Sequence, residues 1–512
     1  MMVKTFLSFN TLFYKTALAL LCAVFLFFWT GKAGAQTFSA ETFTLNNGMQ
    51  VVLIPNNRAP VVTHMLWFKA GAMDEPYGKS GIAHYLEHLM FKGTEQLAPG
   101  EFSTTVKKLG GEHNAFTSWD YTAYFESVSV QHLETIMRMG AGRMQNLSPP
   151  EKDIHSELNV VIEERRQNIE NNPKRHFREQ LRTALYPHHP YGKPIIGWMP
   201  EIEKLGWEDA REYYDAWYTP ANAILVVSGA VTRDELKALS SEIYGQIPAR
   251  SVPERTKALH TGHNGQVQIS AADPEIHQPE LYRLYKVPGW TLNKEDSKRL
   301  DILSVVLGGG SGSRLYNALV IEQKLATRLY VYYDGFQRDT SELAIHAVPA
   351  EGVALEDLDA AIDAEILKLV EDGISEEEFQ RAVNQLLADA IYARDSLSGP
   401  AMIVGRAMIT GVSLDDIETW PEQIEAVSRG DVSVVADKYL NPLSVQNYVT
   451  GYLYPEKMNV FSGNDKNPQS IDSDMESDMK SDLDTGSGMS ENERNMQGQD
   501  NEAKNGNYDE QE

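Results

Sequence analysis

Cysteine is almost absent from this chain. The only cysteine among its 512 residues is Cys22, which lies within an apolar N-terminal run. The residues beyond that run contain no thiol, so the sequence excludes disulfide bonds and thiolate metal ligands there. Any metal site must therefore be built from histidine and carboxylate side chains.

Positive charge is also scarce. The chain has 46 Lys and Arg residues against 72 Asp and Glu residues, a formal net charge of −26. Binding to a nucleic acid requires a basic face for the phosphate backbone, so the composition argues against that class of function. The negative charge would favour basic peptides as ligands, although it can equally serve solubility.

The N-terminus has the three parts of a secretory signal. Lys4 and Lys15 precede an apolar run from Ala17 to Trp29, and small residues follow at Ala33-Gly34-Ala35. The run is shorter than the roughly 20 residues that a membrane span needs. We therefore expect residues 1–35 to be a signal peptide, with export to the periplasm and no membrane span in the mature chain.

The C-terminal end is strongly acidic. Residues 462–512 contain 14 acidic and 4 basic residues, a net charge of −10, which leaves −16 for the rest of the chain. Such a polar segment cannot bury enough apolar surface to offset the entropy lost on ordering. It is predicted to be a disordered, solvating tail, with a binding tail as the alternative.

The remaining sequence has the pattern of an α+β protein. Mixed helical and strand periodicity predicts an N-terminal domain over residues 36–249 and a C-terminal domain over 266–461. A stretch rich in Pro, Gly, Thr and His, residues 250–265, is predicted to be a linker. The predicted helices of the first domain are Gly81–Phe91, Gly100–Leu109, Val130–Asn146, Pro150–Asn171, Trp207–Tyr218 and Thr232–Tyr244.

The two predicted domains resemble each other in sequence. Asp209–Gly229 and Asp431–Gly451 align at a constant offset of 222 residues, with five identities in 21 positions. Both read as a helix, a turn with proline and a buried strand that reaches a glycine. The pattern predicts two homologous domains, each an antiparallel-rich sheet covered by helices; chance similarity is the alternative.

The strongest local signal is the motif His84-Tyr85-Leu86-Glu87-His88 in a stretch with helical periodicity. His84 and His88 are four residues apart, so on a helix their imidazoles project from one face, one turn apart. This spacing lets two nitrogen atoms bind one zinc ion. Glu87 can lean over the same site without being a ligand and accept a proton from water. A histidine-rich surface helix is the alternative interpretation.

A catalytic zinc ion usually takes a third protein ligand from elsewhere in the chain. Glu157 and Glu164 lie seven residues apart on the predicted helix that starts at Pro150, so both lie on one face. The pattern permits Glu164 as ligand and Glu157 as a carboxylate that orients a ligand histidine. Periodicity alone does not choose between them, and a solvated acidic helix face is the alternative.

These motifs resemble a known family. The stretch Gly78–Thr94 is similar to the signature of the pitrilysin/insulinase zinc metallopeptidases, which include the mitochondrial processing peptidase, and Val160–Arg166 is similar to their second motif. The resemblance covers roughly residues 40–455. It implies these roles: His84, His88 and Glu164 as ligands of one zinc ion, Glu87 as general base and Glu157 as the supporting carboxylate.

A further part of the resemblance concerns the substrate. Asn114–Thr117, after Gly110-Gly111, resembles the family's edge strand beside the metal, and Tyr121–Tyr124 continues the match. The resemblance implies that a peptide adds to this strand. The contact residues that it implies are Gly111, Asn114, Ala115, Phe116 and Thr117. It also implies that the two domains close like a clamshell around a chamber that admits peptides and unfolded segments.

The sequence departs from the family at one place. Active single-unit members carry an Arg and, seven residues later, a Tyr in the second domain, where this chain has Val320 and Thr327. Arg328 and Tyr330 lie close by in the wrong register. The missing donors would otherwise stabilise the oxyanion. We therefore expect this chain to be the zinc-bearing half of a heterodimer with a sister subunit; a self-sufficient homodimer is the alternative.

Other functions are compatible with parts of the sequence. A structural subunit of this fold typically loses the residues of the zinc site, yet His84, Glu87, His88 and Glu164 are all present here. A peptide-binding chaperone would bind zinc without turnover. A zinc hydrolase of non-peptide substrates would not need the edge strand. A zinc endopeptidase accounts for the most features.

Overall fold

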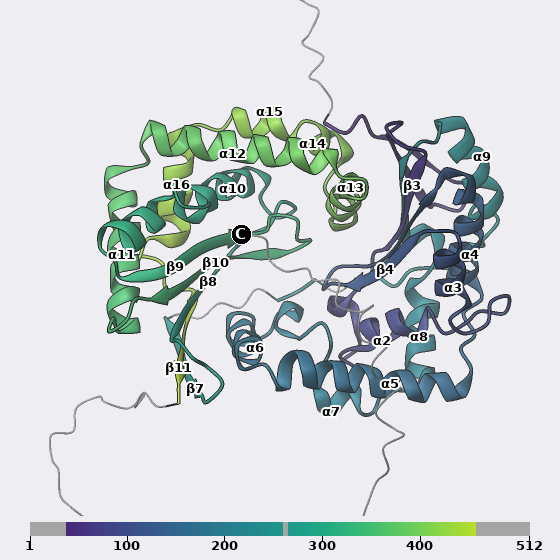
Figure 1. Cartoon of the computed structure of the whole chain (residues 1–512), viewed down its shortest axis with the longest axis horizontal. Helices are drawn as coiled ribbons and strands as arrows, with labels where there is room; N and C mark the ends of the chain where they lie inside the picture. Colours follow the sequence, from purple (N-terminus) through teal and green to yellow (C-terminus); the bar gives the residue numbers. More distant parts are fainter. Residues whose placement is uncertain (1–36, 256, 260–264, 457–512) are drawn as a thin grey trace, which may run out of the picture. The chain divides into compact units, whose positions relative to one another are not determined.

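The structure is a computed structural model that describes residues 37–255, 257–259 and 265–456 (Figure 1). The predicted signal peptide and acidic tail lie outside the described residues, as does part of the predicted linker. Within the described residues, no helix combines the length and apolar character needed to cross a bilayer.

The first sheet has six strands in the order β1-β2-β6-β3-β5-β4. Its strands are β1 (Glu41–Thr44), β2 (Gln50–Pro55), β3 (Val61–Phe68), β4 (Glu112–Thr117), β5 (Thr122–Ser129) and β6 (Ala223–Gly229). Only β2 and β6 pair in parallel; the other neighbours are antiparallel. Strand β4 pairs only with β5 among the described strands, so β4 forms one edge of the sheet.

Local sequence explains the start of this sheet. Strands β1 and β2 form a hairpin around Asn46-Asn47-Gly48, where Gly48 adopts a φ of 88° that favours glycine. Strands β3 and β6 lie in the middle of the sheet and are buried almost throughout, which explains their apolar runs.

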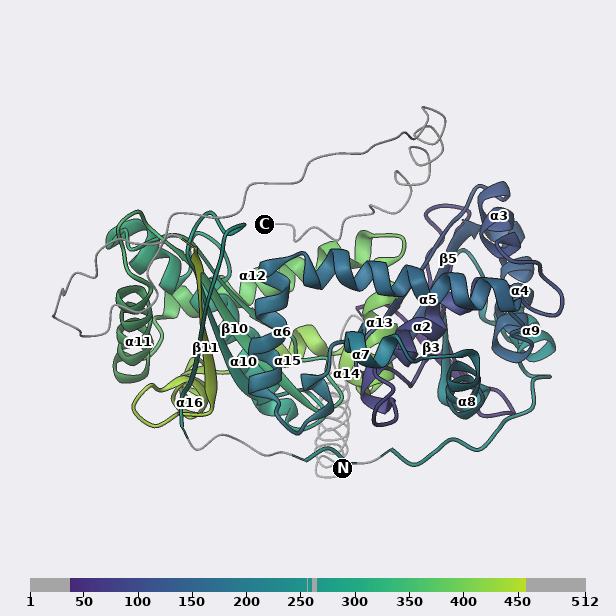
Figure 2. The same cartoon turned by 90° about the horizontal axis from the view of Figure 1, so that it is seen from below.

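Helices cover this sheet and form its main core. They are α2 (Ile82–Leu89), α3 (Glu101–Lys108), α4 (Leu133–Gln145), α5 (Glu151–Arg165), α7 (Met199–Ile202), α8 (Trp207–Trp217) and α9 (Arg233–Ile243), with short helical turns η1 (Ala72–Asp74), η2 (Val130–His132), η3 (Arg166–Glu170), η4 (Pro190–Gly192) and η5 (Pro220–Asn222). The long helix α5 runs beside α2 (Figure 2). The predicted single helix from Pro150 to Asn171 is α5 followed by η3, a π-helical turn.

The second sheet has five strands in the order β7-β11-β8-β10-β9. They are β7 (Val267–Asp273), β8 (Glu280–Pro288), β9 (Ala326–Tyr333), β10 (Thr340–Pro349) and β11 (Tyr448–Pro455). Strands β7 and β11 pair in parallel, and the other neighbours are antiparallel. The first sheet has the same arrangement once β1 is left out, with β2 and β6 as its parallel pair. The shared order and directions confirm two homologous α+β domains.

The second sheet has its own helical layer and core. The elements are α10 (Lys294–Gly308), η6 (Tyr316–Glu322), α11 (Leu355–Asp372), α12 (Glu376–Asp395), α15 (Trp420–Glu425) and α16 (Arg429–Leu440). The short helix α14 (Leu414–Glu418) instead places Ile417 in the cluster that includes Trp67 of the first sheet. Helix α16 and strand β11 match α8 and β6 at the predicted offset, and Gly451 corresponds to Gly229.

Two helices pack against the sheet of the other domain. Helix α6 (Pro173–Leu185) follows the first domain's α5 but buries Phe177 and Leu181 against Tyr282 and Val449 of the second sheet. Helix α13 (Gly399–Thr410) lies late in the chain but packs on β3 and β6 of the first sheet. The two domains therefore exchange one helix each.

Candidate metal centre and peptide-binding edge

The geometry of α2 depends on the turn that precedes it. Gly81 adopts a φ of 89°, and a Cβ there would lie 2.5 Å from the carbonyl oxygen of Ile196. The buried carboxylate of Glu75 accepts hydrogen bonds from the backbone N–H groups of Gly81 and Ala83, at 2.9 and 3.2 Å. These bonds satisfy N–H groups that a helix start leaves unpaired. Glycine and the carboxylate together set where the helix begins.

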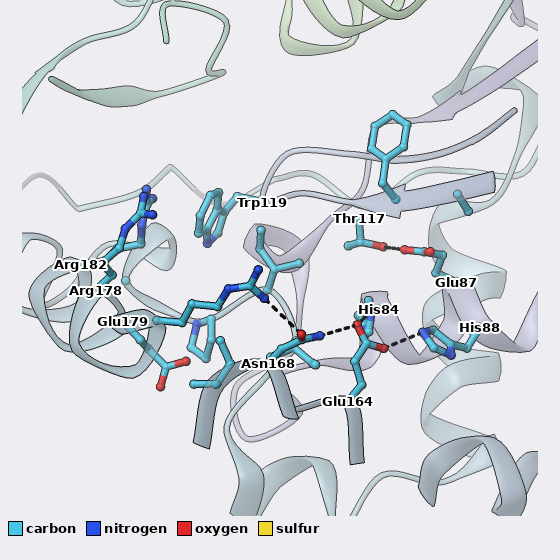
Figure 3. Close-up of a pocket in the computed structure, with 18 of the residues that line it drawn as sticks. His84, Glu87, His88, Thr117, Trp119, Glu164, Asn168, Arg178, Glu179 and Arg182 are labelled. Atoms are coloured by element: carbon cyan, nitrogen blue, oxygen red, sulfur yellow. Dashed lines mark hydrogen bonds and ion pairs between the residues drawn. The ribbon is translucent and has the colours of Figure 1, made fainter. Parts of the chain in front are cut away.

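The two histidines of α2 project toward α5. Their ring centroids are 4.7 Å apart. The Nε2 atom of His84 lies 3.8 Å from one carboxylate oxygen of Glu164, and Nε2 of His88 lies 3.4 Å from the other (Figure 3). One ligand atom from each of the three residues falls within 4.8 Å of the others. This two-histidine, one-carboxylate set fits a zinc ion that keeps an open position.

The structure separates the two glutamates that periodicity left open. Glu164 faces both Nε2 atoms, whereas Glu157 lies behind His88 and accepts a hydrogen bond from its Nδ1 at 2.9 Å. The second oxygen of Glu157 pairs with Lys92 at 2.6 Å. Glu157 therefore holds the imidazole of His88 with Nε2 turned toward Glu164. Nδ1 of His84 is buried with no hydrogen-bond partner among the described residues.

Glu87 lies beside the three-residue cluster without belonging to it. Its buried carboxylate accepts a hydrogen bond of 2.5 Å from the hydroxyl of Thr117 on β4. Burial raises the pKa of Glu87 to about 7, while nearby His88 and the bond from Thr117 oppose that rise. A carboxylate with a pKa near neutrality can both accept and return a proton.

The two histidines differ in their protonation. Burial, with nearby His88, lowers the pKa of His84 to about 4, so its imidazole is neutral at pH 7. Burial also opposes charge on His88, but hydrogen bonds with Glu157 and Glu164 outweigh it and raise the pKa to about 9. A metal ion binds the neutral imidazole, so it would displace the proton of His88.

A cavity of about 660 Å³ joins this cluster to the sheet edge. Of the predicted peptide contacts, the structure brings Asn114, Ala115, Phe116 and Thr117 into its wall, on β4. Gly111 comes just before the strand and does not line the cavity. An unpaired strand edge beside the cluster is suited to adding a peptide strand.

The other end of the cavity is formed by residues that sequence reasoning missed. Helix α6 contributes Arg175, Arg178, Glu179 and Arg182, and the second sheet contributes Leu284 and Glu342. The signal for α6 was present: Asn172 caps it, Pro173 opens it, and buried apolar residues recur every four positions. What the sequence could not indicate was that this helix faces the histidines.

The positions where the family pattern expects Arg and Tyr lie away from this cavity. Val320 is partly buried and packs against the core of the second domain, and Thr327 is exposed near the start of the edge strand β9. Neither they nor Arg328 and Tyr330 line the cavity among the described residues.

A duplicated α+β fold with a helix-borne His-x-x-Glu-His motif and a third carboxylate from a neighbouring helix defines the inverted zinc-peptidase architecture. Residues 50–198 match the family Insulinase (Peptidase family M16), and residues 204–386 match the Peptidase M16 inactive domain. The chain therefore belongs to the insulinase family, peptidase family M16.

Individual relatives agree with this assignment. Zinc protease PqqE of Helicobacter pylori is 31% identical over 406 residues, which are 78% of this chain and 90% of that protein. The probable mitochondrial-processing peptidase subunit beta of Arabidopsis thaliana is 27% identical over 410 residues, covering 78% of this chain and 75% of that protein. The crystal structure of a protease from Helicobacter pylori matches with a TM-score of 0.75 at 30% identity, covering 81% of this chain and all of that one.

Proposed function

We propose that this chain is a zinc-dependent endopeptidase that cleaves peptides or unfolded protein segments. The observation that carries this is the convergence of His84, His88 and Glu164 beside a buried Glu87 and an unpaired strand edge. The family membership and the names of its relatives as zinc proteases support the same activity.

The metal would be held by His84, His88 and Glu164. Glu157 fixes the ring of His88 and the pairing of Glu157 with Lys92 keeps that carboxylate ionised. When bound, zinc supplies Lewis acidity that polarises the scissile carbonyl and lowers the pKa of water.

The peptide binds as an added strand along β4. Main-chain hydrogen bonds to this edge would hold the substrate extended, in contact with Asn114 to Thr117. Gly111, the remaining proposed contact, lies one residue before the strand and outside the cavity wall. Pairing in this way places the peptide bond near Glu87, because Thr117 of the same strand touches that carboxylate.

Glu87 acts as the general base and then the general acid. Its carboxylate accepts a proton from the attacking water and returns it to the leaving amine. The bond from Thr117 orients the carboxylate toward the cavity and favours its charged form.

In the proposed function, this chain is the zinc-bearing subunit of a heterodimer. The described residues at the expected Arg and Tyr positions, Val320 and Thr327, offer no donors to the cavity. A homologous sister subunit would supply the Arg/Tyr pair and half of a chamber that excludes folded proteins. If this chain is active alone, the alternative is a self-sufficient homodimer that uses other donors. If it is inactive with every partner, the alternative is a non-catalytic peptide-binding subunit.

The proposed location is the periplasm. Its support is the signal-like pattern of residues 1–35. The domain limits proposed with it are 36–249 and 266–461, joined by 250–265 and followed by the tail 462–512.

The test is hydrolysis of a quenched fluorescent peptide library by the purified zinc-loaded chain, with Glu87→Gln as control. Activity that disappears in Glu87→Gln and with a chelator establishes the peptidase. Full activity of this chain alone, unchanged when a sister subunit is added, contradicts the heterodimer. A chain that binds zinc but cleaves no peptide, either alone or with a sister subunit, favours the non-catalytic role.

A further inference from the structure

One face of α6 carries a row of arginines into the cavity. Arg175, Arg178 and Arg182 are spaced by three and four residues, so they lie on one side of the helix. All three line the same cavity as the histidine cluster. The opposite side of α6 is fixed, because Phe177 and Leu181 are buried against the second sheet.

The acidic residues at this end of the cavity are already neutralised. Glu179 forms a two-bonded pair with Arg165, with both nitrogen–oxygen distances at 3.0 Å. Glu342 of β10 pairs with Arg182. Neither carboxylate is left to offset the charge of the remaining arginines.

Two guanidinium groups therefore keep uncompensated charge. Among the described residues, the guanidinium group of Arg175 donates only to the side-chain amide oxygen of Asn168, at 3.1 Å, which is a neutral partner. Arg178 is exposed and has no hydrogen bond or ion pair with any described residue. Glu280, on the neighbouring strand β8, is already engaged by Lys174 and His346.

This local charge is opposite in sign to that of the whole chain, whose net charge is −26. Within a cleft, nearby fixed charges decide which ligand is attracted, more than the distant net charge does. Planar guanidinium groups bind carboxylates through paired hydrogen bonds. At this end of the cavity the local charge therefore favours acidic groups, in contrast to the basic peptides that the net charge suggests.

We propose that the arginine face of α6, with Arg178 as its main contact, is a subsite for an acidic side chain of the peptide substrate. This inference rests on the proposed peptidase function. Figure 3 shows Arg178 and Arg182 on one side of Glu164 and shows Glu87 and Thr117 on the other. An Asp or Glu at one distance from the scissile bond, on one side of it only, would reach this face.

The first experiment measures binding, so that it does not depend on turnover. Short labelled peptides with one Glu, Gln or Lys moved along the sequence are titrated against zinc-loaded Glu87→Gln by fluorescence anisotropy. Glu at one position should bind about tenfold tighter than Gln there, and Lys weaker than Gln. Adding Arg178→Glu should reverse the order of Glu and Lys at that position.

The matched control is Lys204→Glu in the same background. Lys204 is exposed, lies outside the cavity and makes no side-chain hydrogen bond or ion pair with a described residue, so the net charge changes equally. It should leave the preference intact. An equal loss of the preference for Glu in both variants would mean that only the net charge attracts the peptide, and would overturn the subsite. Binding that does not depend on the charge of the peptide would also overturn it.

The cleavage assay separates this inference from the proposed function. If the active chain cleaves the Glu and Gln peptides with equal kcat/KM, the subsite is wrong while the peptidase stands. If no peptide is cleaved but binding shows the Arg178-dependent preference, the subsite stands and the peptidase fails. No binding by any peptide removes the subsite.

Discussion

At the scale of single residues, the candidate site is a set of carboxylates whose environments give them different roles. Glu164 faces the two imidazoles, and Glu157 accepts a hydrogen bond from the other ring nitrogen of His88. Glu87 accepts a hydrogen bond from the hydroxyl of Thr117. Three side chains of nearly the same chemistry are thus distinguished by their neighbours alone.

Replacing Glu157 by Gln should weaken zinc binding by roughly 10- to 100-fold, since the ring of His88 loses the anion that orients it and makes it more basic. Zinc affinity measured by competition with a chromophoric chelator would check this. Glu163→Gln is the matched control, because Glu163 is exposed and its one ion-pair partner in the described part of the chain is Arg166. An unchanged affinity in Glu157→Gln would contradict the orienting role.

Replacing Thr117 by Val should move the acidic limb of the kcat/KM profile to higher pH. The hydroxyl of Thr117 lowers the pKa of Glu87 by bonding to the charged form, so removing it raises that pKa, and the base is lost at a higher pH. Peptide cleavage measured from pH 5 to 8 would show the shift. Thr104→Val lies outside the cavity and should leave the acidic limb unchanged. An unchanged acidic limb in Thr117→Val would refute the effect of the Thr117 hydroxyl on the pKa of Glu87.

At the scale of elements, helix α2 is positioned by a group outside its motif. The carboxyl group of Glu75 bonds the first turn, and burial raises its pKa to about 8, against which Lys193 and the two backbone N–H groups act. A helix start fixed in this way gives His84 and His88 a defined direction before any metal binds.

The stability of the metal-free chain should therefore depend on Glu75 in a specific pH window. Between about pH 4.5 and 8 the folded chain keeps the proton that the unfolded chain has lost, so this contribution to stability falls as pH rises. Glu75→Gln keeps an acceptor but cannot titrate, so it should flatten the decline by up to about 1.4 kcal/mol per pH unit.

Urea unfolding of both forms with chelator at pH 5.5 and 7.5 would measure this difference. The exposed Glu208→Gln serves as the control and should follow the wild type. A Glu75→Gln chain whose pH dependence equals that of the wild type would show that the carboxyl group titrates normally.

At the scale of the whole molecule, the two homologous domains are joined by exchanged helices. Gly405 of α13 lies against Trp67 of the first sheet, and Gly451 of β11 lies against Leu181 of α6. Gly405 lets the exchanged helix α13 approach the first sheet closely, and Gly451 leaves room on the second sheet for the exchanged helix α6.

Gly405→Ala should destabilise the molecule by about 1–3 kcal/mol, because its Cβ would lie 2.2 Å from the indole nitrogen of Trp67. Calorimetry should show one transition at a lower temperature, since both sheets depend on the exchanged helices. Gly430→Ala is exposed on α16 and should be neutral or slightly stabilising. Two separate transitions in the wild type would contradict the coupling of the domains.

Sequence reasoning reached the parts of the site that are local. The four-residue spacing of His84 and His88 and the seven-residue spacing of Glu157 and Glu164 are helical repeats, and the structure has helices there. The repeat that ends at Gly229 and Gly451 was also visible in the sequence, and the two sheets share its order. Helix α6 was not predicted, although its cap and the spacing of its apolar residues were present in the sequence.

The sequence by itself determined which residue types could hold a metal, since a folded region without cysteine leaves only imidazoles and carboxylates. It also determined the two-domain α+β class, because periodicity and internal repeats are local properties of a chain. Only the tertiary structure decided that Glu164 faces the imidazoles while Glu157 stands behind, and that Arg178 shares their cavity. Those facts depend on how helices pack across long stretches of chain, and side-chain spacing within one helix carries no information about its partner.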